Sequence, residues 1–143
     1  MSLNAAAFFI DWSDSLQVQR LACGFQVDAN VGDVESKGFE VELSAAPIEG
    51  LTLDMGIGYT DTEVASASGD GFPGYAEGQA LHGVPDWTGT GSAQYIFPAF
   101  SGWDGRLRAD ANYYGDSTSF NNGSIVDRDS WSALNLRAGV LNE

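Results

Sequence analysis

Residues 51–60 read LTLDMGIGYT, and apolar side chains occupy every second position of this stretch. Successive side chains of a β-strand point to opposite faces, so the stretch predicts a strand with one apolar face and one polar face. Residues 39–45, which read FEVELSA, alternate in the same way. Between them lies Pro47-Ile48-Glu49-Gly50, in which proline fixes one backbone angle and glycine permits a tight reversal. Together the two stretches predict an antiparallel hairpin.

The same alternation recurs through the rest of the chain, and no segment shows a helical period. We therefore expect an all-β fold, an antiparallel up-and-down meander of about six long strands. These strands are expected near residues 4–20, 31–46, 51–63, 84–98, 105–117 and 127–141. Soluble strands usually have about 5 or 6 residues, whereas a strand that crosses a membrane needs about 9–11. The expected lengths favour the membrane case.

The connections between these strands alternate in length. Residues 47–50 and 99–104 form short links, while residues 21–31, 64–81 and 118–126 form long polar ones. In an up-and-down antiparallel sheet this order places every long connection at one end and every short turn at the other. Bacterial outer-membrane barrels have this asymmetry, with short periplasmic turns and long extracellular loops.

Composition excludes several other classes of protein. The chain has 143 residues, enough for one domain, and carries 20 acidic against 6 basic residues for a net charge of −14. Nucleic acid is therefore not an expected partner, because phosphate binding needs clustered Lys and Arg. A single cysteine, Cys23, rules out an internal disulfide framework. No apolar run is long enough for a membrane helix, and none has the pattern of a signal peptide.

The alternation alone does not tell whether the apolar face meets lipid or a soluble core. Aromatic residues at the ends of the apolar faces favour lipid, because they suit an interfacial girdle; they are Trp12, Tyr59, Trp87, Tyr95, Phe97, Tyr113 and Trp131. The polar face carries charge that suits a wide, water-filled or plugged lumen. The residues expected to face that lumen are Glu40, Glu42, Asp54, Arg106, Arg108, Asp110 and Arg137. The solvent face of a soluble sheet would carry similar residues.

Several local patterns resemble TonB-dependent receptors. Residues 30–42, NVGDVESKGFEVE, share the Asn, Gly, Ser-x-Gly and Glu-x-Glu spacing of a strand in that family's barrel. Further segments resemble the strands and turns that follow it, in the same order, at residues 47–53, 58–61, 83–88, 113–116 and 134–139. The resemblance covers nearly the whole chain, from about residue 4 to residue 140.

This resemblance implies a segment of a transmembrane β-barrel of about 22 strands, in the outer membrane of a Gram-negative bacterium. Such receptors contain a plug domain, contact TonB, and take up scarce large nutrients such as ferric siderophores, haem, cobalamin or oligosaccharides. Residues 1–143 are expected to be a partial barrel domain, without plug, signal peptide or the final strands. The resemblance implies no cofactor and no enzymatic activity.

Aromatic residues in or near loop tips often hold large ligands, and four are predicted as ligand contacts: Trp12, Phe72, Tyr75 and Phe120. The competing hypothesis is a soluble secreted all-β ligand-binding module. It predicts a buried core that contains Leu51, Leu53, Met55 and Ile57, with the charges outside.

Catalytic and metal chemistry has little support in the sequence. His82 is the only histidine, and neither it nor Cys23 has the partners that a metal site or a nucleophile needs nearby. Residues 69–74 with Glu77 resemble a cation-binding loop in composition but lack EF-hand spacing. We interpret this segment as an extracellular loop. Paired carboxylates are too common here to indicate a glycosidase.

Overall fold

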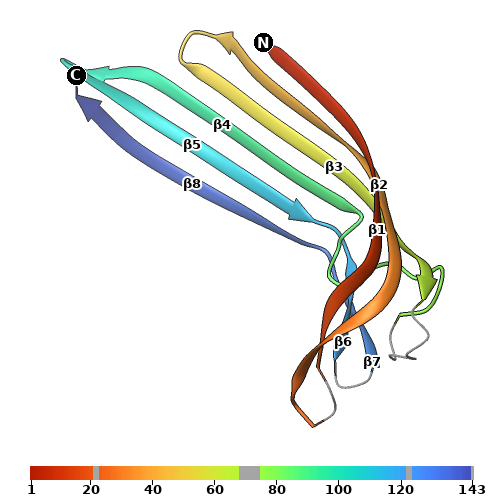
Figure 1. Ribbon diagram of the computed structural model, residues 1–143. Helices are drawn as coiled ribbons and strands as arrows, with labels where there is room; N and C mark the ends of the chain where they lie inside the picture. The colour runs from red at the N-terminus through yellow and green to blue at the C-terminus, as the bar shows by residue number, and fades with distance from the viewer. Residues whose placement is uncertain (21–22, 68–74, 122–123, 143) are drawn as a thin grey trace.

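The chain forms one long antiparallel sheet with a short hairpin beyond its end (Figure 1). The computed structural model describes residues 1–20, 23–67, 75–121 and 124–142. Within these residues the main sheet has six strands in the order β1-β2-β3-β4-β5-β8. Its strands are β1 (Ser2–Arg20), β2 (Gln26–Ile48), β3 (Leu51–Ala67), β4 (Trp87–Phe100), β5 (Trp103–Tyr114) and β8 (Trp131–Asn142). The second sheet pairs β6 (Ser117–Asn121) with β7 (Ser124–Arg128).

The predicted all-β meander is confirmed, since each main strand pairs antiparallel with the next. No helix among the described residues is long and apolar enough to cross a membrane. Strand β4 begins later than predicted, at Trp87 rather than at Val84. Pro85 lacks the N–H that a ladder needs. Immediately before Trp87, the Asp86 carbonyl accepts a hydrogen bond from the Thr60 N–H of β3.

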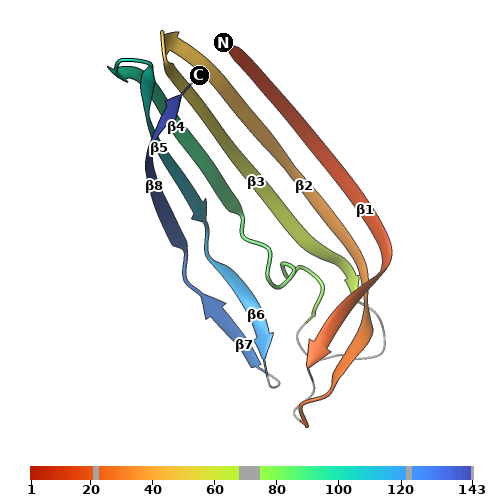
Figure 2. The same ribbon diagram turned by 90° about the vertical axis from the view of Figure 1, so that its left-hand side faces the viewer.

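The long loop predicted at residues 21–31 is wrong. Strand β2 already begins at Gln26, which pairs with Arg20 at the end of β1. Residues 26–31 read QVDANV, so they too alternate between polar and apolar side chains. Strands β1 and β2 therefore form an extended hairpin, and its outer part lies at the same end of the sheet as the β6–β7 hairpin (Figure 2).

The third long connection is also more ordered than predicted. Tyr114 pairs with Trp131. Ser117, three residues after Tyr114, pairs with Arg128, three residues before Trp131. The β6–β7 hairpin thus keeps the register of β5 and β8, and the four strands form one long hairpin with a break near Gly115. At that break the Gly115 N–H donates to the Trp87 carbonyl of β4.

Strands β1 and β2 bend sharply at two bulges (Figure 1). Asp14 has a φ of 53° and Gly32 has a φ of 104°, conformations that Asp and Gly tolerate better than other residues. Side chains hold the bend in place. The Asp14 N–H donates to Asp33 Oδ1 at 3.1 Å, and Asn30 Nδ2 donates to Asp14 Oδ1 at 2.9 Å. As a result, the outer part of β1 reaches β6.

One face of the main sheet is apolar and open. Met55 is 61% exposed and Ile57 is 48% exposed, and the register aligns them with Gly91 and Gly89 of β4. The buried hydrophobic cluster of the described residues lies elsewhere and contains Val31, Val34, Val64 and Leu81. The core that a soluble module requires of Leu51, Leu53, Met55 and Ile57 is therefore not formed.

Aromatic rings mark both ends of the apolar face. Near the long connections Tyr59 lies 4.8 Å from Trp87 between ring centroids, and the Lys37–Asp61 ion pair follows at 3.2 Å. Near the short turns Tyr95 stacks on Phe97 at 5.6 Å. From Trp87 to Phe97 a strand extends about 34 Å, or about 26 Å of membrane thickness at a tilt of about 40°. A transmembrane barrel has an apolar band about 25 Å tall, which matches.

Two aromatic residues predicted for this girdle lie on the other face. Trp131 pairs with Tyr114, whose parity along β5 is that of the polar residues. Trp12 pairs with Val34, on the same side as Phe8. The alternation of β1 misleads because both of its faces carry apolar residues in this stretch.

The Phe8 ring lies across Gly38 on the neighbouring strand. A Cβ at Gly38 would collide with the Tyr59 carbonyl oxygen and lie 2.7 Å from the Phe8 ring. We expect Gly38→Ala to lower the free energy of unfolding by about 1–3 kcal/mol, measured by urea titration of the complete barrel in detergent micelles. Gly139→Ala is the control, because its Cβ meets nothing within 4 Å. Equal unfolding midpoints for the two variants would contradict this account of the packing.

Candidate functional site

The polar face of the main sheet forms a continuous surface, which we call the polar wall. The strand register aligns its side chains in rows, for example Ser44, Asp54, Ser92, Asp110 and Asn135 across five strands. All of the residues predicted to face a lumen lie on this wall: Glu40, Glu42, Asp54, Arg106, Arg108, Asp110 and Arg137. The geometry thus brings them together on one side, as the alternation requires.

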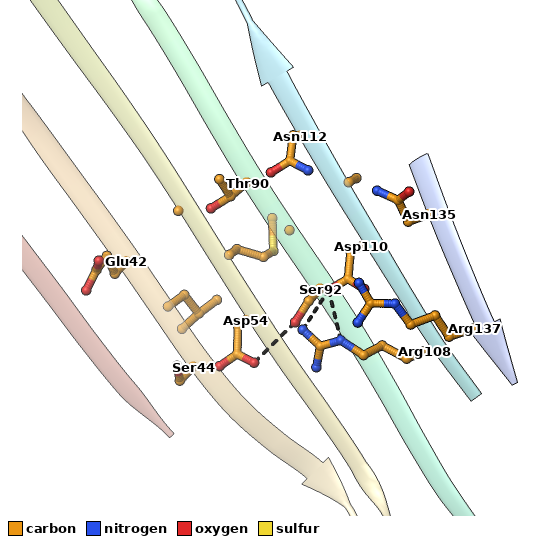
Figure 3. A pocket seen from close by; sticks show the side chains of 15 residues that line it. Glu42, Ser44, Asp54, Thr90, Ser92, Arg108, Asp110, Asn112, Asn135 and Arg137 are labelled. Carbon is orange, nitrogen blue, oxygen red and sulfur yellow. Dashed lines mark hydrogen bonds and ion pairs between the residues drawn. The ribbon is translucent and has the colours of Figure 1, made fainter. Parts of the chain in front are cut away.

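The half of the polar wall near the short turns is charged, with both signs present (Figure 3). Arg108 and Asp110 lie on the same strand, and the arginine holds the carboxylate through Nη2 at 2.6 Å and Nε at 2.8 Å from Oδ1. Arg137 of β8 approaches Asp110 Oδ2 at 3.9 Å. Among the described residues this Oδ2 is buried without a hydrogen-bond partner. Asp110 is therefore fixed on one side and still able to accept a donor on the other.

Asp54 is held from both neighbouring strands. Ser44 Oγ of β2 donates to Oδ1 at 2.7 Å, and Ser92 Oγ of β4 donates to Oδ2 at 3.3 Å. The carboxylate therefore stands upright over β3 at the edge of a hollow of about 520 Å³. Figure 3 shows Asp54 and Asp110 on opposite sides of Ser92.

The half of the polar wall near the long connections has a different character. Glu40 lies beside Gly58 and Glu42 lies beside Gly56, so β3 presents no side chain there. The hydroxyls of Thr88 and Thr90 lean over the two glycines; a Cβ at Gly58 or Gly56 would lie 2.9 or 3.0 Å from them. We call this place the glycine hollow, which is lined by Glu40, Glu42, Gly56, Gly58, Thr88 and Thr90 and has a volume of about 190 Å³.

A stacked aromatic pair stands at the far side of the glycine hollow. The rings of Tyr114 and Trp131 have centroids 4.6 Å apart and planes 14° apart. Tyr114 pairs with Thr88, which in turn lies next to Gly58 and Glu40 in the same row. The pair stays accessible, since Tyr114 is 42% exposed and Trp131 is 54% exposed.

A second aromatic group lies among the connections at the end of the sheet. His82 has ring contacts with Tyr75 at 4.7 Å and with Phe120 at 6.0 Å, and its Nδ1 lies 2.8 Å from Thr118 Oγ1. The Gly83 N–H donates to the Thr118 carbonyl at 2.7 Å. Burial raises the pKa of the Tyr75 phenol above its ordinary value. These contacts join the connection after β3 to the β6–β7 hairpin.

The buried cluster supports this aromatic group from below. Leu81 and Tyr75 pack on the cluster of Val31, Val34 and Val64, which spans β2 and β3. Backbone bonds hold the segment in position, because the Val64 N–H donates to the Gln79 carbonyl at 2.9 Å. The described part of this connection is therefore hydrogen-bonded to β3 at Val64.

Of the four aromatic residues predicted as ligand contacts, the structure brings two together. Tyr75 and Phe120 lie on either side of His82. Trp12 lies apart from them on the polar side of β1 and is 53% exposed. Phe72 lies outside the described residues, as do residues 69–74 of the loop considered for a cation. Within the described ranges no group of ligating side chains could hold a metal ion.

Sequence reasoning missed two features of this site. It considered His82 only as a metal ligand or a base, and it placed Trp131 on the apolar face. A usable signal was present for the second: Tyr114 and Trp131 are equally distant in sequence from the Asn122-Gly123 dipeptide, a hairpin-turn signal that indicates cross-strand pairing. The contact of His82 with Phe120 depends on loop geometry and left no such signal.

The family of the chain follows from a comparison with known proteins. A family model described as "TonB dependent receptor-like, beta-barrel" matches residues 1–141. The chain belongs to this family. No curated protein sequence matches it significantly. TonB-dependent receptors are receptors and transporters rather than enzymes, and membership agrees with the exposed apolar face and the aromatic rows at its two ends.

Phe120→Ala should loosen the contact between the two connections of this TonB-dependent receptor barrel. Ring pairs contribute about 0.5–1.5 kcal/mol, so we expect the Gly83 N–H to exchange with deuterium roughly 2- to 10-fold faster. Phe100→Ala removes a ring pair with Trp103 at the other end of the sheet and serves as the control. Unchanged exchange at Gly83 in the Phe120 variant would show that the stack does not hold the segment.

Proposed function

We propose that the chain forms part of the barrel wall of a receptor in the outer membrane of a Gram-negative bacterium. The receptor takes up a large, scarce nutrient with energy delivered through TonB. The observation that carries the proposal is the two-sided sheet. Its apolar face is open and bounded by aromatic rows, while its other face carries carboxylates and guanidiniums. Within lipid this arrangement is stable only as part of a closed barrel, because unpaired strand edges are costly there.

In this proposal the polar wall faces the lumen. Its charged half, around Asp54 and Asp110, would contact the plug domain that fills such a barrel. Two features support this role. Asp110 Oδ2 has no hydrogen-bond partner among the described residues, and Asp54 is fixed by two serines at the edge of a hollow. Both carboxylates line this hollow, and each retains lone pairs that could accept donors from a polar surface.

The ligand would first meet the receptor at the connections beyond the aromatic girdle. Tyr75 and Phe120 are the residues best placed to contact it, since they flank His82 on a supported segment. Trp12 and Phe72 remain proposed contacts. The family resemblance leaves the ligand open among ferric siderophores and other large nutrients.

Met55→Lys tests the orientation of the sheet, because Met55 lies midway along the apolar part of β3. A lysine on the lipid face near the bilayer midplane costs about 2–4 kcal/mol, so we expect a loss of that size in urea titrations in phospholipid vesicles. Thr90→Lys is the matched control on the polar wall and should change stability much less. If Met55→Lys is tolerated as well as Thr90→Lys, the apolar face does not meet lipid.

Deletion of the gene in its host tests the uptake function. We expect the deletion strain to lose growth on one nutrient as sole source, screened with ferric hydroxamates, ferric catecholates, haem, cobalamin and oligosaccharides. Restoring the gene with Tyr75→Ala and Phe120→Ala should leave at least about a tenfold weaker affinity for that nutrient, as expected for aromatic anchors. Growth that is unaffected on every nutrient, with the protein absent from outer-membrane fractions, would refute the proposal.

A further inference from the structure

The polar wall changes chemically along its length. Its charged half contains Arg106, Arg108 and Arg137, whereas the rows through the glycine hollow contain no Lys or Arg among the described residues. These rows are Glu40, Gly58, Thr88, Tyr114 and Trp131, and Glu42, Gly56, Thr90, Asn112 and Ala133. Neither Glu40 nor Glu42 forms an ion pair within the described part of the chain. The place therefore repels anions and offers acceptors to neutral or cationic donors.

The stacked pair adds an apolar surface to these acceptors. A centroid separation of 4.6 Å is too short for rings lying side by side, so Tyr114 and Trp131 overlap face to face. Trp131 comes from β8 and covers one side of the Tyr114 ring. Thr88 and Gly58 lie between Tyr114 and Glu40 in the same row of the register. Three strand spacings of about 4.8 Å separate the two backbones, about 14 Å in all.

The hollow is also long. It shares Glu42, Gly56 and Thr90 with the larger hollow of about 520 Å³. Asn112 and Asn135 also line that hollow, whereas Arg108, Asp110 and Arg137 line its part in the charged half of the wall. An aromatic face, uncompensated carboxylates, threonine hydroxyls and side-chain amides thus follow one another along an open, elongated surface. A pyranose chain matches each of these groups. The C–H face of a sugar ring packs on an aromatic ring. Its hydroxyls donate hydrogen bonds to carboxylates, and they both donate to and accept from amides and hydroxyls.

We propose that the glycine hollow binds a neutral carbohydrate chain, with one sugar ring against Tyr114 and hydroxyls donating to Glu40 and Glu42. Because Gly56 and Gly58 have no side chains, the sugar rings can lie close to the backbone of β3. This inference rests on the proposed uptake function and selects carbohydrate from the ligand classes left open there.

The test uses the complete receptor, purified from outer membranes in detergent micelles. Calorimetric titrations with hexasaccharides of glucose, galactose, mannose and xylose are compared with titrations of choline and of a ferric catecholate. We expect at least one hexasaccharide to bind. Tyr114→Ala should weaken its affinity about tenfold or more, as should Glu40→Gln combined with Glu42→Gln. Tyr114→Phe keeps the ring and should stay within about threefold of the parent.

Trp103→Phe is the matched control, because Trp103 lies at the short-turn end and pairs with Asn142. It should leave affinity unchanged. Binding of choline but no hexasaccharide would make this a cation site, and binding of the ferric catecholate alone would contradict the charge argument. Saccharide binding that is insensitive to Tyr114→Ala would place the sugar elsewhere. Each of these results overturns the inference, and the uptake function itself fails separately, in the deletion experiment.

Discussion

The ladder of backbone hydrogen bonds between antiparallel strands is the constraint on which the rest of this sheet depends. In lipid no water is available to satisfy a strand's N–H and C=O groups, so each must pair with a neighbouring strand. The register between β3 and β4 and between β5 and β8 runs without a shift. Because side chains alternate strictly along such a ladder, the polar and apolar residues of separate strands fall into common rows. Both faces of the wall follow from that single regularity.

Irregularity is confined to the two ends of the main sheet, outside the part that carries the apolar face. Register shifts occur around Asp14 and Gly32, and at the short turns beside Ile48 and Phe100. At the loop end the shifts turn β1 and β2 out of the plane of the sheet and bring β1 towards β6. The same bend buries Val31 and Val34 beneath the connection that carries Tyr75. A packed core is thus present beyond the loop end of the apolar face. The apolar face itself is not covered by this core, so its stability depends on what surrounds the sheet.

The sequence was sufficient for the parts of the fold that depend on period two. Residues 51–60 predicted a two-faced strand, and every charged residue assigned to the polar side lies there. The sequence-based prediction failed where the alternation of polar and apolar residues is ambiguous. In β1 both parities carry apolar residues, so Trp12 was assigned to the wrong face. The strand at residues 26–31 was overlooked because its polar residues resemble those of a loop.

The aromatic contacts of the site were less predictable. Tyr75 and Phe120 were chosen for their type, and nothing in the sequence indicated that His82 joins them. That contact depends on a connection docking on β3 and on a hairpin continuing the register of β5 and β8. Both are tertiary features, and neither leaves a local periodicity.

The direction of the first and last strands of the main sheet has a further consequence. Strand β1 starts at the end where the short turns lie, and β8 finishes there, so both ends of the chain lie on the same side of the sheet (Figure 1). Strands that flank this sheet would therefore pair antiparallel with β1 and β8. If these six strands were removed, the two flanking strands would still be antiparallel to each other. A block of whole hairpins can be duplicated, deleted or exchanged between barrels while every flanking strand keeps its direction. Barrel circumference can in this way change during evolution in steps of two strands, with the inside and the outside of the wall preserved.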